Sequence, residues 1–321
     1  MTIPADEQRR DGLAVIDKPA GWTSHDVVAK ARGILHNKKI GHSGTLDPDA
    51  TGVLLLGVGR VTRLLRFLTA LPKTYETEIV LGVETNTLDD SGVVVATYDM
   101  NGVTLEAVRA AAAALTGPIL QIPPMVSAVK IDGRRLHELA REGIEVDRPP
   151  RPVTVYRFAI EPVDQPADQP VDQVEPVLVY RAVVECSSGT YVRTLAADLG
   201  HALGGGAHLR NLRRTAIGSF TLAEARPLDD VVVIAPAEAL RDYDSVVVSD
   251  QLLLDVRHGK VLPSEVLGVA GDGPWAVLAD DGSLLAVYES HRDGTVKPAV
   301  VLAPVTEAAT PSTGGASPSG E

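Results

Sequence analysis

The sequence predicts a mixed α/β (α+β) protein of two domains, from three observations. The chain has 321 residues, 45% of them hydrophobic, which is enough for about two domains. Runs with strand-like alternation and runs with helical periodicity follow one another through most of the chain. Towards the end only short strand-like runs remain, namely PWAVLAD, SLLAVYE and KPAVVLA. These short runs predict a compact second domain made mainly of β-structure.

The first half of the larger domain begins after a polar segment, residues 1–11, that we expect to be disordered. GLAVIDK is typical of a strand, and TSHDVVAKARGIL of a helix with Thr23 or Ser24 as its N-cap. A polar, glycine-rich loop follows. ATGVLLLGVG then indicates a buried strand or a close-packed turn and strand, and VTRLLRFLTAL has helical periodicity.

The second half continues the same alternation. TYETEIVLG alternates like a strand, and TLEAVRAAAAALTG predicts a helix that ends at Gly117. Residues 123–152 are rich in proline and basic residues and are expected to form an inserted segment. VTVYRFAIEPV and PVLVYRAVVECSS predict paired strands, and AHLRNLRRTAIGSFTL predicts another after the helix YVRTLAADLGHALG.

The domain limits follow from these elements and from composition. The larger domain is expected to span residues 12–228 and the small β-domain residues 229–304. The repetitive acidic stretch 161–176 predicts an exposed, variable loop, and the polar tail 305–321 predicts disorder.

Targeting and cysteine signals are sparse. The polar start does not resemble a signal peptide, and no run of about 18 apolar residues predicts a membrane span, so we expect a cytoplasmic protein. The single cysteine, Cys186, excludes an intrachain disulfide and a cysteine-based metal cluster. Its place in a strand-like run predicts a buried thiol with no chemical role.

The charge distribution matters more than the net charge of −12, which by itself argues against a polyanionic partner. No acidic residue occurs between Asp49 and Glu76, a window that contains Arg60, Arg63, Arg66 and Lys73. A basic face on an acidic protein would suit RNA. An ordinary solvated surface would give the same pattern.

The stretch KKIGHSGTLDPDATGVLLLGVGRVTR is the most informative part of the chain. Its glycines permit tight turns, and Pro48 fixes the backbone directly after Asp47. Such a loop can hold one carboxylate rigidly at the mouth of a cleft. Asp47 could equally be a turn residue that caps the backbone, because aspartate before proline is a common turn signal.

This stretch resembles the signature of the TruB family of tRNA pseudouridine synthases. Four other blocks match the family in the same order: KPAGWTSHDVV, KTYETEIVLGVETNTLDDSG, PPMVSAVKIDGRRLHELAREG and CSSGTYVRTLAADLGHALGGGAHLRNLRRTAIGSF. Collinear matches from about residue 12 to residue 220 are far more specific than any one motif. The resemblance implies a catalytic domain built on a mixed, largely antiparallel sheet, followed by a small PUA-like β-barrel domain that binds RNA.

The resemblance also implies an activity and its central residues. The family isomerises the uridine at position 55 of the T-loop of tRNA to pseudouridine after flipping the base. Asp47 falls on the nucleophilic aspartate, and Arg193 on the arginine that keeps this carboxylate ionised and oriented. Tyr75 falls on the tyrosine that packs against the flipped uracil. The reaction adds and removes no atoms, so no cofactor and no metal is expected.

The remaining implied contacts are to the substrate. Tyr191 falls on a tyrosine that contacts the substrate, and Leu212 on an apolar contact to the base. His42 falls on a histidine that fills the space left by flipped T-loop bases. Lys18 and Lys130 are candidates for phosphate or structural contacts. The expected partner is the T-stem-loop of tRNA, with no membrane contact, and the protein is expected to be a monomer.

Two alternatives remain at this point. The run Asp47-Pro48-Asp49-Ala50-Thr51 also fits D-x-D-x-T, the motif of Mg²⁺-dependent aspartyl-phosphate phosphatases, with Asp89 and Asp90 as downstream acids. In that class the first aspartate directly follows an apolar parallel strand, whereas Asp47 follows a polar loop. The other alternative is a non-catalytic protein that binds or folds tRNA.

Overall fold

The chain divides into two compact units after Asp242. The computed structural model describes residues 11–127, 129–131, 133–163 and 178–302. Because the division follows Asp242, the domain boundary expected near residue 228 is too early. Residues 229–242 pack on the first unit, where the backbones of Leu13 and Ile234 exchange hydrogen bonds of 3.0 and 2.8 Å and Val231 is buried. The expectations for residues 1–10, 164–177 and 303–321 lie outside the described residues.

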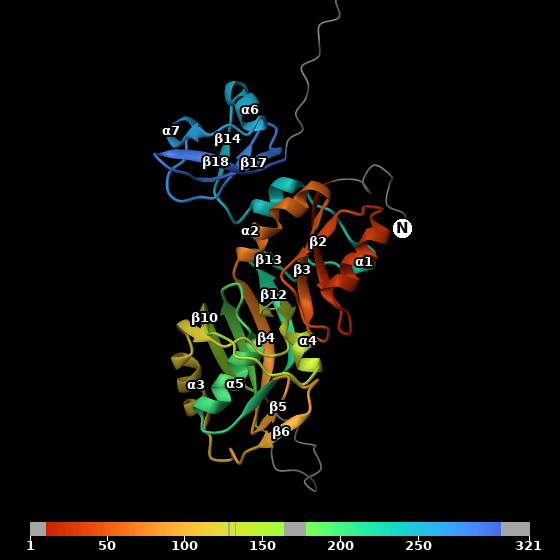
Figure 1. Ribbon diagram of the computed structural model, residues 1–321, viewed down its shortest axis with the longest axis vertical. Helices are drawn as coiled ribbons and strands as arrows, with labels where there is room; N and C mark the ends of the chain where they lie inside the picture. The colour runs from red at the N-terminus through yellow and green to blue at the C-terminus, as the bar shows by residue number, and fades with distance from the viewer. Residues whose placement is uncertain (1–10, 128, 132, 164–177, 303–321) are drawn as a thin grey trace, which may run out of the picture. The chain divides into compact units, whose positions relative to one another are not determined.

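The first unit is built on a nine-stranded sheet (Figure 1). Its main path runs β1-β3-β12-β4-β11-β10-β7, while β2 pairs with β3 and β13 with β12. All pairs are antiparallel except β12 with β3. The strands are β1 (Gly12–Lys18), β2 (Ile40–Ser43), β3 (Thr51–Val58), β4 (Lys73–Leu81), β7 (Gly117–Gln121), β10 (Arg151–Pro162), β11 (Val179–Cys186), β12 (Ala207–Ile217) and β13 (Phe220–Thr221). The predicted mixed, largely antiparallel sheet is confirmed.

Helices pack on this sheet around two hydrophobic clusters (Figure 1). One cluster joins α3 and α5 to β4, β10, β11 and β12, and Cys186 lies buried in it as predicted. The other joins α1 to β1 and β3. The helices of this unit are α1 (Ser24–Ile34), α2 (Leu65–Ala70), α3 (Leu105–Ala114), α4 (Leu136–Arg141) and α5 (Val192–Ala202), with 3₁₀ turns η1 (Gly59–Leu64), η2 (Leu228–Asp230) and η3 (Pro236–Leu240).

Local chemistry decides where helix α1 begins. Thr23 is its N-cap, because the Thr23 hydroxyl accepts from the Asp26 backbone N–H at 3.1 Å and Asp26 accepts from the Thr23 backbone N–H at 2.9 Å. This reciprocal pair is a capping box, which satisfies two backbone donors at the helix start. Of the two N-cap candidates, the structure selects Thr23.

Two element boundaries differ from the sequence prediction. The run that begins at Val61 lies in the 3₁₀ turn η1 before it becomes the helix α2. Helix α3 ends with Leu115 as its C-cap, two residues before Gly117. Gly117 instead starts β7 with φ of 101°, a value that suits glycine.

Gly52 is required by the contact between β3 and β12. Its φ is 102°, and a Cβ at this position would lie 2.1 Å from the carbonyl oxygen of Arg214. We therefore expect Gly52→Ala to destabilise the fold by roughly 3 kcal/mol, because the backbone of β12 would have to move. Thermal unfolding checks this against Gly33→Ala. Gly33 lies in α1 with open space around it, so alanine there should stabilise by about 0.5–1 kcal/mol. Equal stability of the two variants would contradict the assignment.

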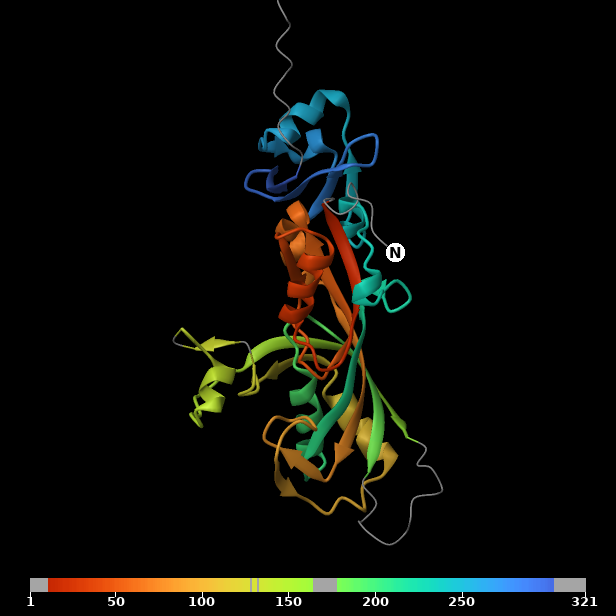
Figure 2. The same ribbon diagram turned by 90° about the vertical axis from the view of Figure 1, so that its right-hand side faces the viewer.

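Smaller sheets complete the first unit. A hairpin of β5 (Val83–Thr85) and β6 (Val94–Thr97) follows β4, and β8 (Lys130–Ile131) pairs with β9 (Arg134–Arg135) ahead of α4. Figure 2 shows β8, β9 and α4 standing away from the main sheet. These elements lie in the inserted segment 123–152 that the sequence predicts, and its last residues already belong to β10.

The second unit is a five-stranded sheet with two short helices. The strand order is β14-β16-β17-β18-β15, and Trp275 and Tyr288 lie buried in its core. The predicted small β-domain is confirmed as a fold. The elements are β14 (Ser245–Val247), α6 (Asp250–Arg257), β15 (Leu262–Pro263), α7 (Ser264–Leu267), β16 (Trp275–Leu278), β17 (Leu284–Ser290) and β18 (Thr295–Val301).

Candidate active site

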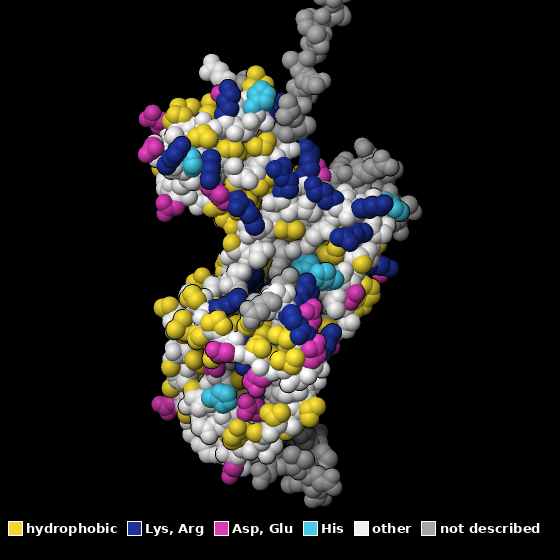
Figure 3. All heavy atoms as spheres, viewed as in Figure 1, with side chains coloured by type: hydrophobic (Ala, Val, Ile, Leu, Met, Phe, Trp, Pro, Cys, Tyr) yellow, Lys and Arg dark blue, Asp and Glu magenta, His cyan; other side chains and the backbone are white. Residues whose placement is uncertain are grey.

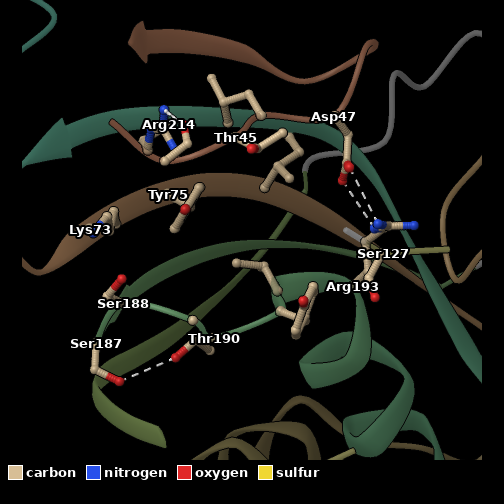
Figure 4. Close-up of a pocket in the computed structure, with 16 residues that line it drawn as sticks. Thr45, Asp47, Lys73, Tyr75, Ser127, Ser187, Ser188, Thr190, Arg193 and Arg214 are labelled. Carbon is tan, nitrogen blue, oxygen red and sulfur yellow. Dashed lines mark hydrogen bonds and ion pairs between the residues drawn. The ribbon is translucent and has the colours of Figure 1, made fainter. Parts of the chain in front are cut away.

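A cavity of about 280 Å³ in the first unit brings most of the predicted residues together (Figure 4). Its walls come from the loop between β2 and β3, from β4, from the turn between β11 and α5, and from β12. Residues from segments more than a hundred positions apart therefore meet in one pocket. The predicted residues that line it are Asp47, Tyr75, Tyr191, Arg193 and Leu212.

Asp47 and Arg193 form a two-pronged ion pair (Figure 4). Arg193 Nε lies 3.1 Å from Asp47 Oδ2, and Arg193 Nη2 donates to Asp47 Oδ1 at 3.3 Å. The Arg193 side chain is 5% exposed, whereas that of Asp47 is 44% exposed. The buried arginine is thus the fixed partner, and the carboxylate faces the pocket with one orientation.

Further contacts hold Arg193 in place. Its Nη1 lies 3.3 Å from Asp89 Oδ2 and donates to the Thr87 carbonyl at 3.0 Å, while its Nη2 also donates to the Val126 carbonyl at 2.9 Å. Asp89 is oriented in turn by the hydroxyls of Thr87 and Ser91, at 2.6 and 2.5 Å. The guanidinium therefore bridges two carboxylates.

Opposing effects set the protonation of Asp47. Desolvation by the surrounding protein raises the pKa of its carboxyl above the usual range, and Arg193 acts in the opposite direction. Asp89 adds to the rise. Arg193 is thus the principal group that favours the ionised, nucleophilic form of Asp47.

Lys18 supports the loop that carries Asp47. Its side chain is fully buried, and Nζ donates to the carbonyls of Pro19, Trp22 and Pro48 at 2.9, 2.6 and 2.9 Å. Burial lowers the pKa of Lys18 to about 8, which leaves the ammonium charged at neutral pH. Lys18 was expected to make either a phosphate contact or a structural contact, and these hydrogen bonds fit the structural role. A buried, fully engaged ammonium has no surface to offer a phosphate.

Tyr75 and Leu212 form the apolar part of the pocket. Tyr75 is buried on β4, and burial raises the pKa of its phenol, so the ring is neutral at physiological pH. Leu212 lies in an irregular part of β12, next to Asn211, whose φ is 55°. At this irregularity in the strand, the side chain of Leu212 lines the cavity. A flat ring and a branched aliphatic side chain suit the faces of a planar base.

Tyr191 is held through its backbone at the start of α5. Its N–H donates to Gln121 Oε1 at 2.7 Å, and its carbonyl accepts from Gln121 Nε2 at 3.1 Å. Gln121 is 2% exposed and belongs to β7. The sequence pattern did not single out Gln121, because the contact joins residues 70 positions apart.

His42 does not line the pocket with Asp47 but lies on β2, half buried, with its ring at 5.2 Å from that of His25 in an edge-on arrangement. Burial lowers the pKa of His42 to about 4, with His25 adding to the shift. The ring is therefore neutral at physiological pH, which suits packing against a base better than proton donation.

The pocket also contains Lys73 and Arg214, two cationic residues that were not predicted as site residues (Figure 4). Each stands two positions along a strand from a predicted residue: Lys73 precedes Tyr75 on β4, and Arg214 follows Leu212 on β12. Side chains two apart on a strand point to the same face. That periodicity is the signal that would have found Lys73 on the regular strand β4. On β12 the register is irregular between Arg210 and Arg213, so alternation alone does not predict Arg214.

Basic residues also gather on the surface. Figure 3 shows Lys and Arg side chains over the region of α1, β2 and α2, with few acidic ones between them. The exposed residues of this region include Lys38, Lys39, Arg60, Arg63 and Arg66. Lys73 belongs to the same sequence window but is buried. The side chain of Lys130 lies outside the described part of the structure.

The phosphatase alternative finds no support in the geometry. Asp47 follows the short strand β2, which pairs antiparallel with β3, whereas the phosphatase motif follows a parallel strand. Within the described residues, no group of three or more His, Cys, Asp or Glu side chains is arranged to hold a metal ion.

None of the helices in the described part of the chain has both the length and the apolarity needed to cross a membrane.

Known proteins of one family resemble this chain over most of its length. The model of the TruB family pseudouridylate synthase N-terminal domain matches residues 32–192, and that of the tRNA pseudouridylate synthase B C-terminal domain matches residues 193–253. The chain is 42% identical to tRNA pseudouridine synthase B of Arthrobacter sp. (strain FB24) over 92% of this chain and 98% of the relative. It is 45% identical to that of Mycobacterium sp. (strain KMS) over 92% and 97%.

A solved structure has the same fold. The chain matches one from the crystal structure of a Cbf5-Nop10-Gar1 complex with a TM-score of 0.65 and 25% identity, over 91% of this chain and 82% of that one. These matches place the chain in the class of pseudouridine-forming enzymes. The chain belongs to the TruB family of pseudouridylate synthases. Its activity is that of a pseudouridine-forming isomerase.

Proposed function

We propose that this enzyme converts the uridine at position 55 of the tRNA T-loop to pseudouridine, with Asp47 as its nucleophile. The ion pair between Asp47 and Arg193 carries the proposal, because it fixes one oriented carboxylate at the edge of a pocket with walls suited to a flat base. The substrate is taken from the relatives, whose names state tRNA pseudouridine synthase B.

The proposed reaction uses the pocket as follows. The flipped uridine enters between Tyr75 and Leu212, with Tyr191 beside it. Asp47 attacks either C1′ of the ribose or C6 of the base, the glycosidic bond to N1 breaks, and the base turns and rejoins the ribose through C5. The C5 hydrogen leaves as a proton and N1 gains one, so the product is an isomer of the substrate. The reaction calls for no cofactor.

The RNA outside the pocket would lie along basic and aromatic surface. His42, near the loop that carries Asp47, would pack in the space left by flipped bases, and the exposed basic residues of η1 and α2 would contact phosphates. Lys130 stays a candidate for a phosphate contact, and a PUA-like RNA-binding role is proposed for the second unit. We further propose that the protein is a monomer and that it acts in the cytoplasm.

Tritium release from a T-stem-loop RNA labelled at uridine C5 tests the proposal. Bond formation at C5 must expel that hydrogen, so wild-type protein should release tritium without added metal and Asp47→Ala should not. A second RNA with the target uridine replaced by cytidine, labelled at other uridines, controls for position. Tight binding of the RNA with no release would instead favour a non-catalytic RNA-binding protein.

A further inference from the structure

Two buried cations in the pocket have no carboxylate partner among the residues that the structure describes. Arg214 is 1% exposed and Lys73 is 5% exposed, and both line the cavity. In the described part of the chain, neither forms an ion pair with an acidic side chain. Nearby arginines differ, because Arg193 is paired with Asp47 and Asp89, Arg210 with Glu78, and Arg213 with Asp17.

Backbone carbonyls satisfy only part of these two cations. Arg214 donates from Nε to the Val53 carbonyl at 2.7 Å and from Nη2 to the Gly44 carbonyl at 3.1 Å. Lys73 Nζ donates to the carbonyls of Thr69 and Leu71. Arg214 also forms a side-chain hydrogen bond with Tyr75. None of these partners is a carboxylate, so the bonds do not neutralise the charge of either cation.

The two side chains converge on one point of the pocket wall. A methyl group built on Gly44 would lie 3.5 Å from Nη1 of Arg214 and 3.9 Å from Cε of Lys73. Figure 4 shows both at the end of the pocket opposite the pair of Asp47 and Arg193, next to Tyr75. Burial, with Arg214 adding to it, lowers the pKa of Lys73 to about 8.

An uncompensated pair of buried cations costs folding free energy, so an anion in the working complex is the physical reason to keep it. The proposed reaction supplies one. When the C1′–N1 bond breaks, its electron pair stays on the base and is shared by N1, O2 and O4. Addition of Asp47 to C6 likewise puts negative charge on O4. By either route, attack at C1′ or at C6, negative charge forms on the uracil ring while the attacked carbon lies at Asp47.

We propose that Arg214 and Lys73 are catalytic residues that stabilise the negative charge developing on the uracil ring. The inference rests on the proposed function. A base held between Tyr75 and Leu212 with its ribose at Asp47 extends its carbonyl oxygens towards the opposite end of the pocket. Preorganised cations in a water-poor site act strongly there, since removal of one such donor typically costs about 10²–10³-fold in rate.

A leaving-group test separates this role from simple positioning. The substrates are two T-stem-loop RNAs with uridine or 5-fluorouridine at the target position, because fluorine withdraws electrons and stabilises the same charge. The rate at which the target nucleoside disappears is measured in single turnovers at saturating enzyme, by nuclease digestion and chromatography. The variants are Arg214→Met, Lys73→Met and the conservative Arg214→Lys. Arg210→Met is the control, because Arg210 is paired with Glu78 and does not line the cavity.

With uridine, Arg214→Met should lose about 10²–10³-fold in rate and Lys73→Met at least tenfold. With 5-fluorouridine each of these losses should be at least tenfold smaller. Arg214→Lys should retain part of the rate that Arg214→Met loses. The control Arg210→Met should have the wild-type rate on both RNAs. The ratio of the two rates within one variant does not depend on its folded fraction. Equal losses on both RNAs would overturn the inference. So would weaker RNA binding with an unchanged rate at saturation, which would assign the cations to a phosphate. A wild-type protein that converts neither RNA would overturn the proposed function as well.

Discussion

Asp47→Asn is expected to lower the rate of pseudouridine formation by at least about 10⁴-fold, because asparagine has the shape of the side chain without its nucleophilic charge. RNA affinity should stay within severalfold of wild type, since one carboxylate contributes little to phosphate contacts. Tritium release in single turnovers gives the rate, and filter binding gives the affinity.

Asp49→Asn is the matched control for this variant. It removes the same charge two residues away, and Asp49 lines a neighbouring cavity with Asp47 but not the one that contains Tyr75. We expect it to retain most of the activity. A phosphatase of the D-x-D-x-T class would need both carboxylates, so loss of activity in both variants would reopen that alternative. Full activity of Asp47→Asn would contradict the assignment of the nucleophile.

The sequence predicted the parts of this site that motifs can carry. The glycine-rich loop around Asp47 and the block around Arg193 were matched separately, and the structure brings the two side chains within 3.1 Å. Tyr75 and Leu212 line the same cavity. The alternation of strands and helices was likewise visible from periodicity. The order of strands in the sheet was not, because it depends on pairings between distant segments.

Other features depend on three-dimensional contacts that no local pattern records. Lys18 has the composition of a surface residue, yet three carbonyls of two separate loops enclose its ammonium. Gln121 fixes Tyr191 across 70 positions of sequence. No local sequence pattern assigns residues 229–242 to the first unit. The backbone hydrogen bonds between Ile234 and Leu13 do. Burial and register, not residue type, decide these cases.

Arg193→Met is expected to shift the acid side of the pH–rate profile to higher pH. Desolvation and Asp89 both raise the pKa of Asp47, and Arg193 opposes them, so its removal raises that pKa further. The ionised fraction of a carboxyl falls as pH drops through its pKa. The variant should therefore lose most activity at low pH and regain part of it as the pH rises.

Single-turnover rates from pH 5 to 9 at saturating enzyme measure this shift, with thermal unfolding as a check on the fold. Arg193→Lys keeps one positive charge without the two-pronged geometry, so its acid limb should move less while its maximal rate still falls by roughly 10²-fold from lost orientation. Arg109→Met controls for loss of an arginine, because Arg109 donates to the Ile160 carbonyl from α3 and does not line the cavity. A general fall in rate with an unmoved acid limb in Arg193→Met would mean that the arginine only orients Asp47, and that ionisation of the nucleophile is secured by another group.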